Sequence, residues 1–184
     1  MIKERIPITG ELKDKVQALM KYAGWHEDRR VDISAAEQYY ARRGMPMMKS
    51  TARFYRRYFG LCPQWYLEVR KTTHAADFWF ALFPYMVDSI KDSFQDEMFA
   101  SMAGEDLRII ESCAGMPCQP VGHIGYYYPA EVWISEHGKL LARWEYQDET
   151  EIFDSVFDLI ERELRTCKFD SAAMKSLRAF DARS

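Results

Sequence analysis

The chain has 184 residues, of which 48% are hydrophobic, and its formal net charge is −3. This length fits a single domain whose hydrophobic core needs neither a metal nor disulfides for stability. Four cysteines are too few for a disulfide scaffold, no basic start leads into an apolar leader, and no apolar stretch approaches the ~18 residues of a membrane span. We therefore expect a soluble, cytoplasmic protein.

Charge is distributed unevenly along the chain. Residues 1–71 contain 15 Lys and Arg and 8 Asp and Glu, a balance of +7, whereas residues 72–184 contain 10 and 20, a balance of −10. This asymmetry does not decide the fold, but it influences which partners are attracted and how fast they associate. We expect a basic partner to prefer the second half of the chain.

A corner follows the first predicted helix. Apolar residues recur at i, i+4, i+7 and i+8, which predicts one buried stripe on a helix, formed by Leu12, Val16, Leu19 and Met20. Gly24 can adopt the left-handed conformation that ends such a helix. We expect the large ring of Trp25 to fold back on the apolar stripe, so that its burial stabilises the corner.

Two further helices are predicted before the first predicted strand. Ser34 and Glu37 have the spacing of a capping box, which predicts that a second helix starts at residue 34 and runs to residue 43, before Gly44. A third helix is predicted over residues 50–60, where aromatic and basic residues alternate at helical spacing.

The middle of the chain is predicted to contain both strands and helices. Aromatic, β-branched and alternating residues predict strands, whereas a 3.6-residue apolar period predicts helices. The predicted strands are residues 64–70, 117–123, 131–135 and 139–146, and the predicted helices are residues 86–102 and 107–110. Residues 76–85 fit a strand, but their continuous apolar character fits a buried helix as well. Glu136, His137 and Gly138 are expected to form the tight turn of the last hairpin.

The last predicted element is a helix with a continuous apolar face. We expect Asp148 and Glu151 to cap it, and its buried residues to be Ile152, Phe153, Val156, Phe157, Ile160 and Leu164. This orientation would leave Glu151, Asp154, Asp158 and Glu161 facing solvent and repelling one another.

We expect one domain over residues 1–166, followed at residues 167–184 by a weak extra helix or a mobile tail. Together these elements indicate an α+β fold.

The corner after the first helix is similar to a motif of one protein family. In the third subgroup of the SUKH superfamily of bacterial immunity proteins, the motif is Ala-Gly-Trp, any residue, Pro-Gly-Arg, any residue and Val-Asp. The matching residues here are Ala23, Gly24, Trp25, Arg29, Val31 and Asp32, with Glu27 and Asp28 in place of Pro-Gly. Further matches follow in the same order at Phe59-Gly60-Leu61, Pro120-Val121-Gly122, Val132-Trp133-Ile134 and Gly138-Lys139-Leu140.

The resemblance implies an α+β fold in which helices pack on a mostly antiparallel sheet. It also implies a cytoplasmic antidote that binds a toxin domain delivered by a neighbouring bacterial cell. We expect a monomer or a weak dimer that acts without catalysis. The motif residues expected to have structural roles are Gly24, Trp25, Arg29, Asp32, Gly60, Pro120, Gly122 and Gly138.

Two sets of residues are candidates for contact with such a toxin. The first is a group of carboxylates that would attract a basic toxin surface, such as that of a nuclease: Glu136, Glu151, Asp154 and Asp158. The second is Tyr126, Tyr127 and Tyr128, of which at least one ring must face outward if the segment is extended, because successive strand residues face opposite sides. We expect steric and electrostatic occlusion of the toxin, with a few buried aromatic residues supplying most of the affinity.

No pattern in the sequence indicates an enzyme, a cofactor or a metal site. The histidines are scattered at positions 26, 74, 123 and 137. Cys113, Cys118 and His123 come nearest to a ligand set, but structural zinc sites usually pair cysteines two to four residues apart and need a fourth ligand. Phosphate-binding glycine loops and nucleophile elbows are absent from the sequence. We expect free thiols.

Two other functions remain open from the sequence. The basic cluster Arg42, Arg43, Lys49, Arg53, Arg56 and Arg57, with tyrosines among its members, would suit nucleic-acid binding. The same cluster would also suit a solvated helix face whose arginine stems cover apolar surface. Alternatively, the chain could be an intracellular scaffold or a regulatory module of the broader SUKH superfamily.

Overall fold

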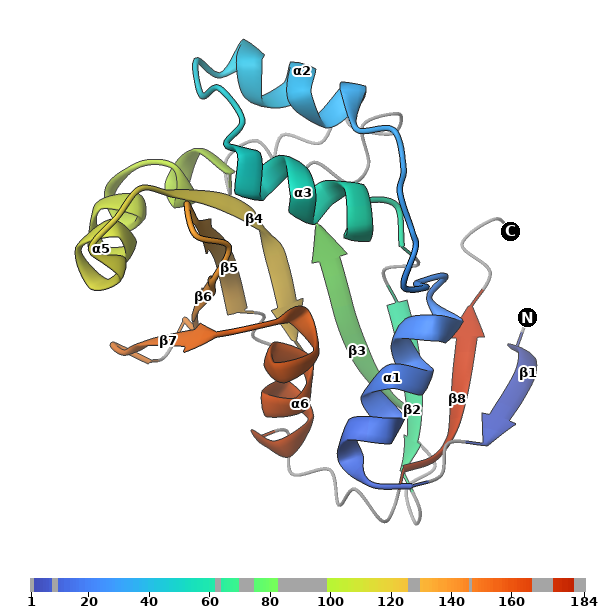
Figure 1. Cartoon of the computed structure of the whole chain (residues 1–184). Coiled ribbons are helices and arrows are strands. Elements are labelled where there is room, and N and C mark those ends of the chain that lie inside the picture. Colours follow the sequence, from blue (N-terminus) through green and yellow to red (C-terminus); the bar gives the residue numbers. More distant parts are fainter. Residues whose placement is uncertain are drawn as a thin grey trace.

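The computed structural model describes residues 2–7, 10–61, 64–69, 75–82, 99–125, 130–145, 147–166 and 174–180. Within them, eight strands form one antiparallel sheet in the order β1-β8-β2-β3-β4-β5-β6-β7, against which helices pack (Figure 1). The predicted α+β fold is therefore confirmed. The strands are β1 (Ile2–Pro7), β2 (Gln64–Val69), β3 (Ala75–Leu82), β4 (Cys118–Gly125), β5 (Ala130–Ser135), β6 (Leu140–Arg143), β7 (Thr150–Phe153) and β8 (Met174–Phe180).

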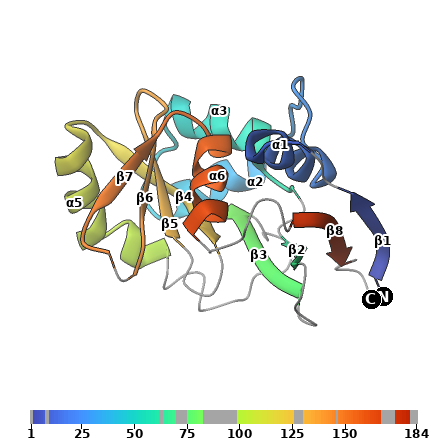
Figure 2. The ribbon, with the colours of Figure 1, turned by 90° about the horizontal axis from the view of Figure 1, so that it is seen from below.

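The helices are α1 (Leu12–Tyr22), α2 (Ser34–Arg42), α3 (Lys49–Tyr58), α5 (Glu105–Ala114) and α6 (Val156–Thr166). Figure 2 shows α1 and α3 on the same side of the sheet, and α1 packs along α6. The helix predicted over residues 86–102 lies mostly outside the described residues, although 99–102 are helical. Among the described helices, none is long and apolar enough to cross a membrane.

The two ends of the chain form neighbouring strands that the sequence did not predict. β1 lies at one edge of the sheet, and β8 lies between β1 and β2. Leu177 of β8 pairs with Ile6 on one side and with Leu67 on the other. The expectation of a weak helix or a mobile tail is therefore wrong for residues 174–180, because these residues complete hydrogen bonds with two strands that are distant in the sequence.

α2 begins at Ser34 as predicted, but the expected capping box does not form. Ile33 is the N-cap residue, and Asp32 lies just before it: Asp32 Oδ1 accepts hydrogen bonds from the backbone nitrogen of Ser34 at 3.1 Å and from Ser34 Oγ at 2.6 Å. These bonds lower the pKa of the Asp32 carboxyl. Glu37 lies in the first turn of α2, and its carboxylate oxygen is 3.9 Å from Arg56 Nη2 on α3.

The last helix is shorter than predicted. Residues 150–153 form β7, which pairs with β6 from Leu140↔Phe153 to Arg143↔Thr150. α6 therefore starts at Val156, and Ser155 Oγ accepts a hydrogen bond from the backbone nitrogen of Asp158 at 3.3 Å. The expected cap at Asp148 and Glu151 is wrong, as is the expected burial of Ile152, whose surface is 53% exposed. Strand pairing explains the difference, because it satisfies the backbone of residues 150–153 outside the helix.

Buried tyrosines fasten α2 and α3 to the sheet. The hydroxyl oxygens of Tyr40 and Tyr55 lie 3.2 Å apart, and both rings are fully buried. Tyr55 donates a hydrogen bond to the carbonyl of Val121 at 3.0 Å, and Tyr40 donates one to the carbonyl of Pro120. Burial raises the pKa of both hydroxyls, so they stay protonated and act as donors. The result is a fixed position of α3 relative to β4.

Candidate functional site

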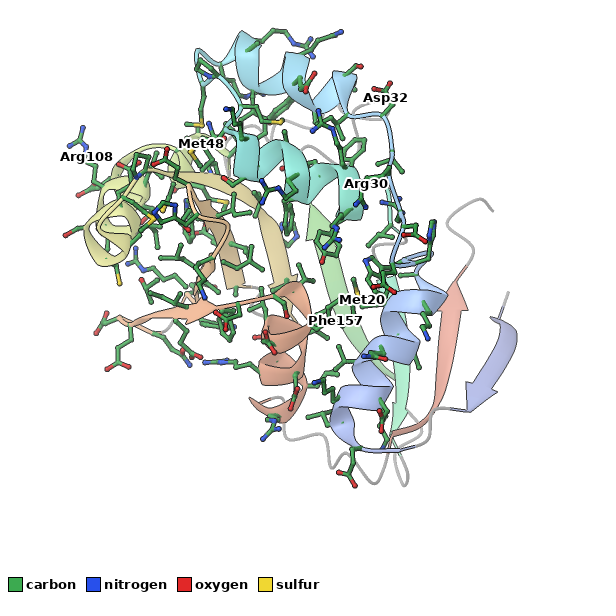
Figure 3. All side chains as sticks on the ribbon, in the orientation of Figure 1. Met20, Arg30, Asp32, Met48, Arg108 and Phe157 are labelled. Carbon is green, nitrogen blue, oxygen red and sulfur yellow. The ribbon has the colours of Figure 1, made fainter. Side chains whose placement is uncertain are left out.

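The corner after α1 joins two helices. Gly24 has a φ of 99° and donates to the carbonyl of Lys21 at 3.0 Å, while Trp25 donates its backbone N–H to Met20 at 2.9 Å, which is the Schellman arrangement. The half-buried Trp25 ring meets Phe157 of α6 edge to face, with 4.8 Å between ring centroids. Figure 3 shows Phe157 and Met20 where α6 and α1 adjoin. The corner residues therefore hold α1 against α6 as well as ending α1.

Arg29 connects the corner to the C-terminal end of α3. Its side chain is buried, and Nη1 and Nη2 donate to the carbonyls of Arg57 and Phe59 at 2.9 and 2.6 Å. A cation is favourable there because the last carbonyls of a helix carry partial negative charge. The backbone nitrogen of Val31 also donates to the carbonyl of Arg56 at 3.0 Å. The hydrogen bonds of the Arg29 guanidinium therefore go to backbone oxygens and not to Asp32. Gly60, with a φ of 68°, turns the chain directly after Phe59.

The other glycine motifs lie on the β4–β6 part of the sheet. β4 has an irregularity between Pro120 and Gly122, and Gly122 has a φ of 152°. Gly138 has a φ of 88° and donates to Ser135 at 2.8 Å in the hairpin turn between β5 and β6. This turn places Glu136 and His137 opposite the start of α3, where they line a hollow together with Lys49 and Arg53.

Three adjoining hollows lie along α3, and we call them together the α3 groove. The first, of about 430 Å³, is lined by Arg30, Met47, Met48, Lys49, Ala52, Arg53, Arg56 and Arg57. The second, of about 560 Å³, shares the methionines, Lys49 and Arg53 and adds Ser50, Glu136 and His137. The third, of about 210 Å³, reaches the start of α6 at Asp154. Arg53 lines all three hollows, and Figure 3 shows Met48 and Arg30 near opposite ends of α3.

The groove side of α3 carries uncompensated positive charge. Lys49, Arg53, Arg56 and Arg57 recur at i, i+4, i+7 and i+8 and so share one face, while Thr51, Phe54, Tyr55 and Tyr58 are buried on the other. Among the described residues, Arg56 has only the half-exposed Glu37, at 3.9 Å, as an ion-pair partner, and such a pair contributes little to stability. Within the described part of the chain, no carboxylate pairs with Lys49 or Arg53.

Two local features of α3 are unfavourable for stability on their own. Lys49 occupies the first turn, which contains no acidic residue, although the helix dipole favours negative charge there by about 0.3–1 kcal/mol. Ser50 is 6% exposed and lines two of the hollows, and its Oγ has no hydrogen-bond partner among the described residues. Such departures from local rules concentrate at functional sites. We therefore take the α3 groove as the candidate functional site.

Three of the four carboxylates expected to contact a partner interact with side chains of the same chain. Glu151 forms an ion pair with Arg162, Asp154 with Lys139, and Glu161 with Arg165, while Asp158 bonds to Ser155. The expected mutual repulsion is therefore wrong, because each of these carboxylates lies beside a cation or a hydroxyl donor. Glu136 and Asp154 are exposed and line the hairpin end of the groove. Tyr126, Tyr127 and Tyr128 lie outside the described residues.

Buried titratable groups lie away from the groove. Burial raises the pKa of the Cys118 thiol to about 12 and lowers the pKa of His123 to about 4, so both are neutral at pH 7. Cys113 is exposed, and both cysteines are free. Among the described residues, no three potential metal ligands gather at one point.

Glu163 on α6 carries a buried carboxyl that no sequence pattern indicates. Glu163 is 3% exposed and accepts a hydrogen bond from Trp144 Nε1, while the guanidinium of Arg162 lies 3.6 Å from the centroid of the Trp144 ring. Burial raises the pKa of Glu163 to about 7. In the sequence, the acidic pattern of α6 gave no sign that one of its glutamates faces inward.

Most of the chain matches the model of one known protein family. The family model described as SUKH-3 immunity protein matches residues 12–160. The chain belongs to the SUKH-3 immunity protein family. The resemblance inferred from the corner and the glycine motifs is therefore confirmed. The SUKH-3 match includes every residue that lines the α3 groove, and it excludes β1 and β8. No curated protein and no solved structure matches the chain.

Proposed function

We propose that this SUKH-3 chain neutralises a toxin domain by binding to it and covering the surface with which the toxin acts. Membership of the immunity family over residues 12–160 is the observation that carries the proposal. Neutralisation by binding needs no catalysis by the immunity protein, only an interface stable enough to outlast the toxin's contact with its target. The α3 groove is a concave surface whose lining is cationic and partly apolar, and it could hold part of such a partner.

The toxin domain is proposed to be a nuclease with a basic surface. Proteins that bind nucleic acids neutralise phosphates with Lys and Arg, and residues 72–184 of this chain carry a charge balance of −10. Glu136, Asp154 and Asp158 are exposed around the hairpin and the start of α6, so they can attract such a surface. Glu151, which already pairs with Arg162, and the three tyrosines at 126–128 remain proposed contacts at the edge of this interface.

Nucleic-acid binding is a second candidate function, because the uncompensated cations of the groove suit phosphates. Glu136 and Asp154 at the hairpin end count against it, since a continuous phosphate backbone would pass close to both carboxylates. The formal net charge of −3 also disfavours a polyanion at long range. We therefore place a protein partner first.

The test uses the toxin domain encoded beside the gene for this chain, since an immunity gene is expected next to its toxin gene. We expect the two purified proteins to form a stable complex and the immunity protein to protect cells that express the toxin. Asp154→Lys should slow association at low salt, and the difference from wild type should shrink as salt rises, because the screening length is about 8 Å at physiological ionic strength.

Glu27→Lys is the matched control, because it makes the same change of charge at an exposed residue of the corner. Equal association rates for wild type, Asp154→Lys and Glu27→Lys at all salt concentrations would exclude Asp154 from the interface. Failure of the wild-type chain to bind or protect against the adjacent toxin would contradict the proposed function itself.

A further inference from the structure

The α3 groove has a charge opposite to that expected of a surface that meets a basic toxin. Its carboxylates, Glu136 and Asp154, line the two hollows beside the hairpin, whereas the charged residues that line the first hollow are all cations, among them Arg30, Lys49 and Arg53. A uniformly basic toxin surface would be attracted to one end of the groove and repelled by the other. A toxin that covers both ends must therefore present charge of both signs.

We propose that the α3 groove binds an acidic segment of the toxin domain that presents two carboxylates and, beyond one of them on the same side of the segment, an aliphatic side chain. This inference rests on the proposed function, because it identifies the part of the partner that the groove recognises. The carboxylates of the segment lie against the guanidinium and ammonium groups of α3, and the aliphatic side chain lies against the methionines at the start of the groove.

The spacing of the cations sets the length of the segment. From Lys49 to Arg57, α3 rises by about 12 Å at 1.5 Å per residue. An extended chain covers that distance with about four residues. Because alternate residues of an extended chain face the same side, two carboxylates of such a segment can reach the cations of α3 while the residue between them points elsewhere.

The chemistry of the lining favours carboxylates on a protein. Arginine presents a planar set of donors that matches a carboxylate in two parallel hydrogen bonds, and Arg53 contributes to all three hollows. Met47 and Met48 are half-buried beside these cations, and methionine adapts its shape to varied apolar partners. A phosphate backbone would use the cations but would leave this apolar part of the groove without a partner.

Ser50 is a second, independent indication of a ligand. Its hydroxyl is buried between two hollows and has no hydrogen-bond partner among the described residues. A hydroxyl can both donate and accept, so Ser50 can bond to a backbone group of a segment that enters the groove and shifts the atoms that cover the hydroxyl. Binding would then satisfy a polar group that has no partner among the described residues.

Affinity measurements with the adjacent toxin domain test the proposal. Arg53→Glu places a negative charge beside all three hollows and should weaken the complex at least about tenfold. The new carboxylate would face the carboxylates of the bound segment, and like charges that face each other across an interface lower its affinity. Lys49→Glu should weaken binding as well, and it should not lower the melting temperature, since a carboxylate is favoured in the first turn of a helix. A loss of binding by Lys49→Glu therefore cannot be attributed to unfolding.

Lys13→Glu is the matched control, because it reverses an exposed cation on α1, outside the groove. It should leave affinity within about twofold of wild type, as rim charges distant from a contact contribute little. In the toxin, acid-to-lysine changes in the contacting segment should restore affinity for Arg53→Glu while weakening it for wild type. This reciprocal rescue identifies the segment directly.

The outcomes distinguish the inference from the function on which it rests. If wild type binds the toxin and Arg53→Glu binds as tightly as Lys13→Glu, the groove is not the recognition site, and the inference is wrong while the function stands. If wild type does not bind the toxin, the proposed function fails. If a single-stranded DNA oligonucleotide binds wild type but not Arg53→Glu, and displaces the toxin, the groove is a nucleic-acid site and the inference is overturned.

Discussion

Arg29→Ala would remove the two hydrogen bonds that hold the corner on the C-terminal end of α3. Arg29 donates to the carbonyls of Arg57 and Phe59 at 2.9 and 2.6 Å and is 8% exposed. A hydrogen bond with a charged partner contributes about 1.5–3 kcal/mol, and water can reach part of the freed helix end, so we expect a loss of about 2–4 kcal/mol. For a chain of this size, that corresponds to a fall in melting temperature of roughly 5–15 °C.

The neighbouring Arg30 is the control. It is exposed and lines the groove, and its Nη1 donates to the carbonyl of Arg29. Arg30→Ala should change the free energy of unfolding by less than about 0.5 kcal/mol, while Arg29→Lys, which can keep only one of the two bonds, should lose about half as much as Arg29→Ala. Chemical denaturation measures all three. If Arg29→Ala and Arg30→Ala unfold at the same denaturant concentration, the two hydrogen bonds of Arg29 do not stabilise the fold.

Three more predictions concern stability. Trp25→Ala should lower the free energy of unfolding by about 2–3 kcal/mol, which is less than for a fully buried tryptophan. A double-mutant cycle with Phe157 should give a coupling free energy of about 0.5–1.5 kcal/mol. A coupling near zero would mean that the two rings do not stabilise each other. Asp32→Ala should lower the free energy of unfolding more than Glu37→Ala does, because Asp32 bonds to the backbone and hydroxyl of Ser34 at the start of α2; a larger loss for Glu37→Ala would contradict this assignment. Burial raises the pKa of Glu163 to about 7, so the folded state keeps a proton that the unfolded state releases, and stability falls as pH rises from 4.5 to 7. Glu163→Gln should remove that part of the fall, and parallel stability curves for the two proteins would contradict the assignment.

Local patterns were sufficient for α1, α2 and α3 and for the corner. Gly24, followed by a tryptophan and preceded by an apolar stripe, predicts the end of α1 from about ten residues of sequence, and the structure confirms the helix and the left-handed glycine. The arginines of α3 could likewise be placed on one face from their spacing alone. What spacing could not reveal is whether these charges have partners, since an ion pair such as Lys139 with Asp154 forms only when a hairpin and a helix start come together.

The errors share a physical cause. β8 needs two partner strands that are distant in the sequence, so residues 174–180 show no local sign of the strand that they form. Residues 150–153 fit an apolar helix face, but pairing with β6 competes with the helix and prevails. Asp32 and Ser34 both suit the start of α2, and the capping box spacing gave no means of choosing between them. In each case, tertiary contacts decided between two locally acceptable conformations.

We propose that this SUKH-3 protein neutralises a toxin domain by binding it. The most direct measurement is the activity of the purified toxin domain encoded beside the gene, recorded while the wild-type chain is added in increasing amounts. We predict that activity falls in proportion to the added chain and disappears at one immunity protein per toxin. Full activity at a large excess of the chain, with no complex detected in the same mixture, would contradict the account.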